Sequence, residues 1–340
     1  MSSSQEAAIR LRFSRADGSL GRLGTEKLVE RALAFSAASS GAAILFVIAF
    51  VFMKAYPLLA RDGLAWLARA DWDGAVMEAW WNPDFWRFGA LPLLVGTFAT
   101  TTGALMVAVP LGVGCAIILS EVAPPGLGRI LATAVRLLSG VPSVIFGLVG
   151  LTVVVPFVQK TFITEELGLR YVDVPLDGQS LLAGSLVLAF MIIPFVVAVS
   201  ADAMRSVPES YRFGGLALGM TKWRTIAKLV IPPALPGIVA GIVLATARGI
   251  GEAIAMAMVA GGLANIPHLD RGFVAFLEPV RTLASAIVEN GEGMSVLQVE
   301  SALFSLGATL LVVSVVTSIL ARAAFSRLRT KTGLATERAI

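Results

Sequence analysis

Two charged residues stand deep within apolar sequence, and their types suit the handling of an anion. Arg248 and Glu252 lie inside the apolar run 229–263, which holds no other charged residue. Their four-residue spacing puts both on one face of a helix. Ionised groups at membrane depth are costly, so they either pair or line an aqueous path. The guanidinium of Arg248 suits an oxyanion such as phosphate, and Glu252 would pair with Arg248 when no anion is passing. The alternative is a structural ion pair that locks this helix to a neighbour.

Small hydroxyl side chains form a second candidate pathway. Thr97 and Thr101 share one face of the apolar run 89–120, and Ser139 and Ser143 flank Pro142. Membrane helices also use such residues to approach and hydrogen-bond each other, and we favour packing for these positions. The segment around Pro142 could instead be a kink that flexes during gating.

The composition indicates a membrane-embedded chain that performs no chemistry of its own. Of its 340 residues, 56% are hydrophobic and 15% are charged, and the mean hydropathy is +0.82. A single cysteine, Cys115, and a single histidine, His268, exclude a disulfide framework or a metal cluster built from these residue types. No lysine follows a glycine, so a Walker A loop is absent. We therefore expect no catalytic residue, no metal and no cofactor bound by this chain, and ATP and Mg²⁺ would be bound by a partner.

Six apolar runs are long enough for the ~20 residues that a helix needs to cross a bilayer. They cover residues 32–53, 89–120, 130–159, 178–201, 229–263 and 301–321. Some exceed that length, and we expect tilt, extension beyond the bilayer, or kinks at Pro92, Pro110 and Pro142.

Charge predicts the orientation of these six spans. With a cytoplasmic N-terminus, the inner segments carry 18 Lys and Arg residues, whereas the outer segments carry 8, together with 14 acids. The positive-inside rule then places both termini in the cytoplasm. Five of the six tryptophans lie in the first outer segment, where we expect an interfacial anchor rather than a binding surface. They are Trp66, Trp72, Trp80, Trp81 and Trp86.

A polar segment, Arg205–Pro232, separates the fourth and fifth spans and predicts two short helices. We call it the coupling loop. Ser206 and Glu209 stand at the spacing of a capping box. Tyr211, Gly214, Gly215 and Leu218 would share one face, and Gly219 would end the first helix in a left-handed turn.

The second helix of the coupling loop is predicted to begin at Thr221, which can cap it. An apolar stripe that includes Trp223 and Val230 would lie away from its three basic residues. Pro232, followed by a second proline, would stop this helix.

The coupling loop resembles the cytoplasmic "EAA" loop of bacterial ABC importer permeases. That motif runs E-A-A-x3-G-x9-I-x-L-P, and Gly219 and Pro232 stand at the places of its glycine and proline. Phe213, Gly214 and Gly215 occupy the place of Glu-Ala-Ala, so the first helix would be less rigid, because each glycine costs about 1 kcal/mol relative to alanine. By resemblance, the loop couples the spans to an ATPase.

Further runs resemble the phosphate-specific, PstC-type branch of the family over roughly residues 85–325. They are FGALPL at 88–93, SEVAPP at 120–125, SGVPSVIFGL at 139–148 and RGIGE at 248–252. The resemblance implies an all-α, six-span, MetI-like core in a bacterial plasma membrane. Its implied partners are a second permease, two cytoplasmic ATPases and an external phosphate-binding protein, with no nucleic acid. The division of the chain would be 1–31 (cytoplasmic), 32–84 (first helix and outer loop), 85–325 (permease domain) and 326–340 (cytoplasmic tail).

Other functions remain open at this stage. The sister phosphate permease shares several of these runs, and a sulfate or molybdate permease is the nearest alternative substrate class. A secondary transporter would have no use for the basic helix pair of the coupling loop. A membrane-bound enzyme would need a cluster of His, Asp or Glu near one interface, which the single histidine argues against.

Overall fold

The computed structural model describes residues 3–331, and it describes side chains between residues 29 and 323 apart from Pro125 and Ala321. The part of the predicted cytoplasmic tail at 332–340 lies outside the described residues. The described chain is all-helical, with no strand and one isolated parallel bridge between Gly261 and Val280. The all-α class predicted from the sequence is therefore confirmed.

The chain divides into two compact units, residues 1–53 and 54–340. The first unit is a single helix over its described length, because α1 runs without a break from Ser3 to Asp62. Its last turns belong to the second unit, which holds every other element.

The second unit contains both short and long helices. The α-helices are α2 (Asp73–Trp81), α3 (Leu91–Ile117), α4 (Pro125–Ser139), α5 (Ser143–Val149), α6 (Val155–Phe162), α7 (Glu165–Arg170), α8 (Leu181–Arg205), α9 (Glu209–Ala217), α10 (Lys222–Thr225), α11 (Ile231–Ile250), α12 (Ile254–Val259), α13 (Leu283–Glu289) and α14 (Leu297–Lys331). Single π-helical segments join some of them, at Ile118–Val122, Gly150–Val154 and Ile226–Val230. Short 3-10 helices cover Ala65–Ala68, Leu269–Phe276 and Gly291–Ser295.

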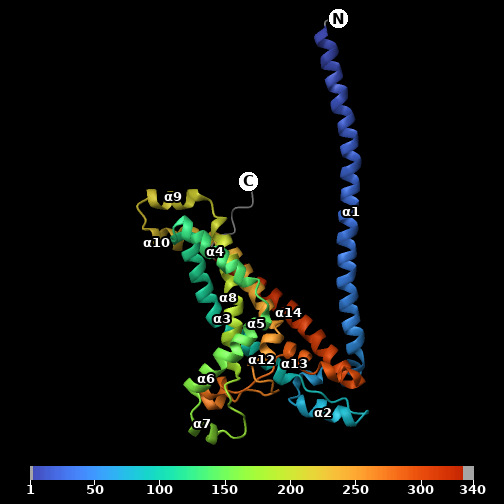
Figure 1. Cartoon of the computed structure of the whole chain (residues 1–340), viewed down its shortest axis with the longest axis vertical. Coiled ribbons are helices and arrows are strands. Elements are labelled where there is room, and N and C mark those ends of the chain that lie inside the picture. The colour runs from blue at the N-terminus through green and yellow to red at the C-terminus, as the bar shows by residue number, and fades with distance from the viewer. Residues whose placement is uncertain (1–2, 332–340) are drawn as a thin grey trace. The chain divides into compact units, whose positions relative to one another are not determined.

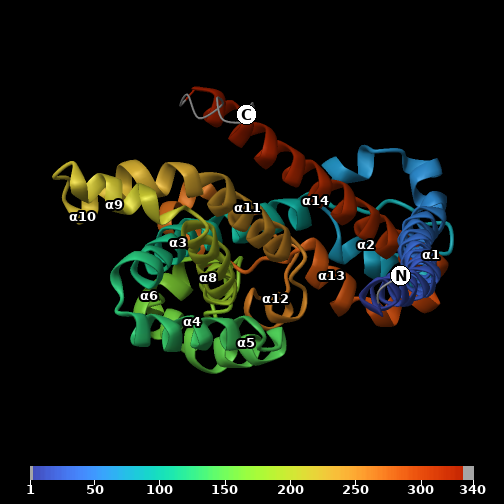
Figure 2. The same cartoon turned by 90° about the horizontal axis from the view of Figure 1, so that it is seen from above.

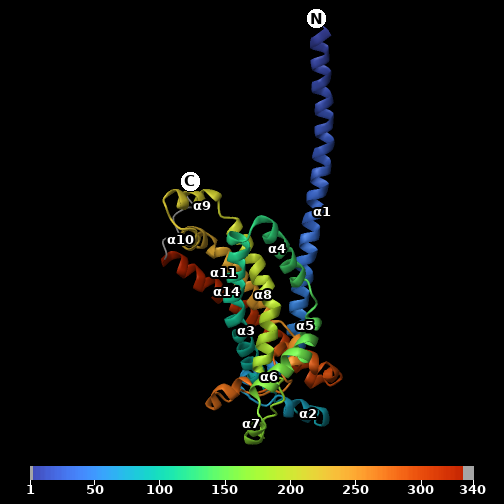
Figure 3. The same ribbon diagram turned by 60° about the vertical axis from the view of Figure 1, so that its left-hand side comes forward.

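The centre of the second unit is formed by α3, α8 and α11, which pack side by side (Figures 1 and 3). Small residues allow close approach: a Cβ at Gly103 would stand 2.5 Å from Oγ of Ser185, and one at Gly112 would stand 2.8 Å from Val196. The helices α9 and α10 lie at one end of this group, and α2, α6 and α7 lie at the opposite end (Figure 1). Seen from above, α9 and α10 also lie to one side of the unit, away from α13 (Figure 2).

Six helical stretches among the described residues are long and apolar enough to cross a membrane, which confirms the predicted number. They are Val29–Asp62, Leu91–Val122, Ser143–Phe162, Leu181–Arg205, Lys222–Ile250 and Leu297–Leu320. The first is longer than predicted, because α1 continues beyond residue 53.

The third predicted span, 130–159, is wrong at its start. The chain forms a separate helix, α4, that ends at Ser139, and the span begins only at Ser143. Pro142 between them has φ −57° and ψ 139°, and the residue before a proline is biased away from helical conformation. The expected kink is therefore a complete break.

The fifth predicted span differs at both ends. Pro232 does not stop the second helix of the coupling loop, which continues as one helical stretch to Ile250. The π-helical segment Ile226–Val230 ends two residues before the proline. In a regular α-helix the proline ring would clash with the carbonyl four residues earlier, and the wider π-helical turn relieves this clash. The helix then ends at Gly251, twelve residues before the predicted boundary at 263.

A hydrophobic core at the α2 and α13 end corrects the expectation for the first outer segment. Trp66 and Trp72 are fully buried among residues such as Leu58, Phe88 and Leu303, so these two rings cannot anchor the chain at an interface. Trp80 and Trp81 are exposed, and the predicted anchor role stays open for them.

Candidate functional site

The first helix of the coupling loop, α9, ends as the sequence predicts. Gly219 has φ +77°. Its N–H donates to the carbonyl of Leu216 at 3.0 Å, and the N–H of Met220 donates to that of Gly215 at 3.0 Å. These two bonds form the Schellman arrangement, which satisfies carbonyls at the helix end. The predicted glycine stop is confirmed.

The start of α9 differs from the prediction. Ser206 and Glu209 do not form a capping box, because the Ser206 hydroxyl donates to the carbonyl of Ala203 at 2.7 Å. Pro208, with ψ 141°, takes the N-cap position, so Glu209 is the first helical residue and not the third. Its charge still lies at the positive end of the helix. Thr221 caps α10 as predicted, with Oγ1 accepting the N–H of Arg224 at 3.4 Å.

The surface of the coupling loop is more apolar than the sequence suggests. Ile226 and Val230 are buried, as expected for an apolar stripe, but Trp223 is exposed. Gly215 is buried and Tyr211 half-buried, whereas Gly214 and Leu218 of the same predicted face are exposed. Phe213 and Leu216 are exposed as well, so the coupling loop exposes four large or branched apolar side chains, these two with Leu218 and Trp223, together with the basic Lys222, Arg224 and Lys228.

Arg248 and Glu252 are not joined in an ion pair. Arg248 lies in the last turn of α11, is exposed, and makes no ion pair with any described residue. Glu252 lies beyond the helix end and is buried, with Oε1 accepting the N–H of Ala255 at 3.2 Å at the start of α12. The expectation of one shared helix face is wrong, because the helix ends between the two residues. The guanidinium is left available to a ligand or a partner chain.

The two threonines proposed for a polar pathway, Thr97 and Thr101, are both buried. The Thr97 hydroxyl donates to the carbonyl of Leu93 at 2.7 Å and accepts the N–H of Leu283 at 2.9 Å, which ties α3 to α13. Thr101 is buried, and its hydroxyl has no hydrogen-bond partner among the described residues.

The hydroxyl residues around Pro142 lie at a helix break. The Ser139 hydroxyl donates to the carbonyl of Arg136 at 2.7 Å, at the end of α4. Ser143 begins α5 and is half-buried, and Pro142 between them is exposed. A part for these residues in gating stays a prediction.

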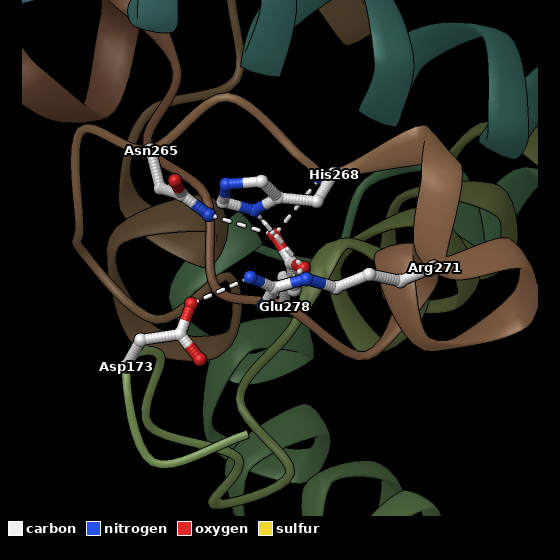
Figure 4. A network of polar contacts seen from close by, with 5 residues as sticks. All are labelled: Asp173, Asn265, His268, Arg271 and Glu278. Carbon is white, nitrogen blue, oxygen red and sulfur yellow. Dashed lines mark hydrogen bonds and ion pairs between the residues drawn. The ribbon is translucent and has the colours of Figure 1, made fainter. Parts of the chain in front are cut away.

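A cluster of charged residues that sequence reasoning missed joins the loop after α7 to the segment between α12 and α13 (Figure 4). It lies at the end of the unit that holds α6 and α7, opposite the coupling loop (Figure 1). The Glu278 carboxylate is fully buried. It accepts bonds from the side chain of Asn265 at 3.0 Å and from Arg271 at 3.4 Å, and Nδ1 of His268 lies 3.0 Å from it. Arg271 also donates to Asp173 at 2.5 Å, from a loop 98 residues away.

The charges of this cluster indicate a structural role, in which ion pairs hold two loops together. The Arg271 guanidinium lowers the pKa of the Asp173 carboxyl, and Asp173 raises the pKa of Arg271. Two carboxylates surround one guanidinium, so the cluster does not favour an anion. No group of three His, Cys, Asp or Glu side chains in the described part of the chain could hold a metal ion.

A second charged group at the same end is centred on Arg281. Its guanidinium bonds to Asp73 of α2, and its Nε lies 2.7 Å from the carboxylate of Glu289 in α13. Burial raises the pKa of Glu289, and Arg281 opposes this effect. The other oxygen of Asp73 accepts the N–H of Ala264 at 3.0 Å, so the group joins three segments of the chain.

The chain belongs to a family of transporter subunits. Residues 108–330 match the family model of the binding-protein-dependent transport system inner membrane component, which shows that the chain is a member of this family. Together with its six apolar helices, this membership makes it a multi-pass membrane protein and a transport subunit.

Curated relatives cover most or all of the chain. It is 32% identical over 348 residues to the phosphate transport system permease protein PstC of Mesorhizobium japonicum, covering 98% of this chain and 100% of the relative. The PstC of Pasteurella multocida is 36% identical, over 74% of this chain and 79% of the relative. The probable ABC transporter permease YqgH of Bacillus subtilis is 38% identical, over 73% and 75%.

A solved structure shows the same fold at low identity. A chain from a bacterial ABC transporter involved in the import of the polysaccharide alginate aligns with a TM-score of 0.50 and 14% identity, over 84% of this chain and 92% of that chain. The fold is that of type I ABC importer permeases, the MetI-like core expected from the sequence.

Proposed function

We propose that this chain is a transmembrane permease subunit of an ATP-driven phosphate importer. The observation that carries the proposal is the match to a phosphate permease along essentially the whole chain, because it extends beyond the segment that all members of the family share. Several such relatives are phosphate transport system permease proteins, and the negative charge of phosphate suits the guanidinium of Arg248, which makes no ion pair among the described residues.

The coupling loop would transmit the work of the ATPases. It exposes four apolar side chains, Phe213, Leu216, Leu218 and Trp223, together with three basic ones, and this combination suits a protein partner. Two ATPase subunits would hold ATP and Mg²⁺, and their closure would displace α9 and α10. A second permease would complete the path, and an external binding protein would deliver phosphate.

We infer the orientation from charge and from the position of the coupling loop. An excess of Lys and Arg on the inner segments supports cytoplasmic termini in a bacterial plasma membrane. The coupling loop would then face the cytoplasm, where ATP is available, and the Glu278 cluster would face outward.

Phosphate would pass Arg248 between the two permeases. In this chain alone the guanidinium is exposed, and its nearest acid in sequence, Glu252, is occupied as a cap for α12. The positive charge of Arg248, which no described carboxylate neutralises, would offset the cost of removing an oxyanion from water inside the membrane.

The test is reconstitution of the complete complex. A tag on this chain should recover an ATPase and a second permease, and proteoliposomes with the loaded binding protein should accumulate labelled phosphate when supplied with ATP. Excess sulfate or molybdate should not compete. Uptake of sulfate or molybdate in place of phosphate would overturn the substrate, and an ion-driven uptake that needs no ATPase would overturn the transporter class.

A further inference from the structure

An arginine inside α9 binds the ends of two different spans. The guanidinium of Arg212 donates from Nε to Oε2 of Glu121 at 2.9 Å and from Nη2 to Oε1 at 2.7 Å. It also donates to the carbonyls of Val207 at 2.7 Å and of Met204 at 2.8 Å. These four bonds engage the two-pronged geometry that distinguishes arginine from lysine.

The two sets of bonds serve different connections. Met204 lies in the last turns of α8 and Val207 in the three residues between α8 and α9, so bonds to their carbonyls shape the coupling loop locally. Glu121 lies in the π-helical end of the α3 stretch, 91 residues earlier in the chain. The ion pair therefore links α9 to a span to which it has no nearby covalent connection.

The Arg212–Glu121 ion pair is shielded and bidentate, as a mechanical link between α9 and the end of α3 requires. The Glu121 side chain is only 5% exposed and that of Arg212 is 23% exposed, so the charges are shielded from solvent. Glu121 raises the pKa of Arg212, and both carboxylate oxygens are engaged by the guanidinium. A partly buried, bidentate pair has less freedom to separate than an exposed single contact.

Neighbouring contacts strengthen the junction without replacing it. The Ser120 hydroxyl lies 3.4 Å from the sulfur of Met204, and Arg205 donates to the carbonyl of Leu119 at 3.5 Å. Both are long contacts between α3 and α8 and do not include α9. A cavity of about 470 Å³ adjoins the pair, with Phe213 and Lys222 in its wall, so α9 is not packed against α3 on this side.

We propose that Arg212 is a positioning residue that, through Glu121, makes the end of α3 move with α9 when a partner ATPase displaces the coupling loop. The inference rests on the proposed function. Without this link, a displacement of α9 would reach α3 only indirectly, through the packing of α3 against α8 and the long contacts at their ends. The response of α3 would then be weaker than that of α8 and α11, to which α9 is joined through the chain.

The decisive variant is Glu121→Ala, because it removes the link to α3 and leaves Arg212 its bonds to the two carbonyls. In the reconstituted complex, we expect normal binding of the ATPase and continued ATP hydrolysis. Phosphate transported per ATP should fall about tenfold, within the usual range of coupling between sites. The matched control is Arg136→Ala, which breaks an exposed pair with Asp202 at 3.8 Å between α4 and α8 and should leave that ratio unchanged.

A covalent link provides the rescue. In a Cys115→Ser background, Glu121→Cys with Arg212→Cys should be uncoupled, and a short bis-methanethiosulfonate reagent that joins the two thiols should restore phosphate transport per ATP. A merely structural role would not be repaired by a tether of different chemistry.

The other outcomes separate the two proposals. An unchanged ratio in Glu121→Ala, with phosphate uptake normal in the wild type, would overturn the link and leave the proposed function standing. Loss of ATPase binding in step with uptake would also overturn it, because the pair would then only shape the docking surface. A wild-type complex that transports no phosphate would refute the proposed function itself.

Discussion

Thr225 of α10 stands directly against Gly215 of α9. A Cβ atom at position 215 would lie 2.8 Å from both Cγ2 and Oγ1 of Thr225, and 2.8 Å from Cδ1 of Leu229. Thr225 is buried and β-branched, so its side chain has little freedom to withdraw. The separation of the two helices of the coupling loop therefore depends on the absence of a side chain at position 215.

Alanine at the two neighbouring glycines should act in opposite directions. Gly215→Ala would force Thr225 or α9 to shift, and overpacking of this kind costs about 1–3 kcal/mol. Gly214 is exposed with no atom within 4 Å of an added Cβ, so Gly214→Ala should stabilise α9 by about 1 kcal/mol. Hydrogen exchange of the α9 amides measures both effects, as faster exchange in Gly215→Ala and slower exchange in Gly214→Ala. Equal effects of the two variants would contradict the packing described.

The orientation can be measured by thiol labelling in intact cells. Cys115 is exposed in the isolated chain, so the background should be Cys115→Ser. Ser295 at the α13 end and Ser210 in α9 are both exposed, whereas Ser285 is buried and would give no signal. We expect an impermeant reagent to label Ser295→Cys and to spare Ser210→Cys until the cells are opened. The reverse pattern would place the coupling loop outside and remove the basis for ATPase docking.

Local signals in the sequence predicted the coupling loop well wherever one residue decides the backbone. Gly219 and Thr221 do what their types allow, because the left-handed turn and the cap each need only a few neighbouring residues. Ser206 failed as a cap because Pro208, two residues later, disfavours the helical conformation for the residue before it, so α9 begins only after the proline. The capping pattern at Ser206 and the backbone restriction imposed by Pro208 predict different helix starts, and the restriction by the proline determines where α9 begins.

Contacts between distant segments were beyond prediction from one sequence. Nothing in the spacing of Arg212 points to Glu121, and nothing near Asp173 points to Arg271, because periodicity reports which face a residue occupies but not which segment covers it. The burial of Trp66 was missed for the same reason, since its neighbours in that core come partly from segments far away in the sequence, such as Leu303.

The buried carboxylate of Glu289 should make stability rise on acidification. Its pKa is raised in the folded chain, so between that pKa and the ordinary value near 4.5 the folded state binds more protons than the unfolded state. The unfolding midpoint of the wild type relative to Glu289→Gln should therefore increase as pH falls from 7 toward 4.5, and level off below. Glu292→Gln, at an exposed position in the 3-10 helix that follows α13, controls for the loss of a carboxylate. A difference that shrinks on acidification would show that Arg281 outweighs burial.

Arg248 and Glu252 should respond differently to substitution, because the structure gives them separate tasks. Arg248→Ala removes an exposed charge with no described ion-pair partner, so assembly should be unchanged while phosphate uptake falls at least about tenfold, or ~1.4 kcal/mol. Arg248→Lys keeps the charge and should retain part of the uptake.

Glu252→Gln can still accept the N–H of Ala255 through its amide oxygen, and should assemble normally. Glu252→Ala leaves α12 uncapped at a cost of about 1 kcal/mol, which should appear as a lower yield of complex. Complex yield and uptake, measured for all four variants, separate the two tasks. Full uptake in Arg248→Ala would remove this residue from the phosphate path.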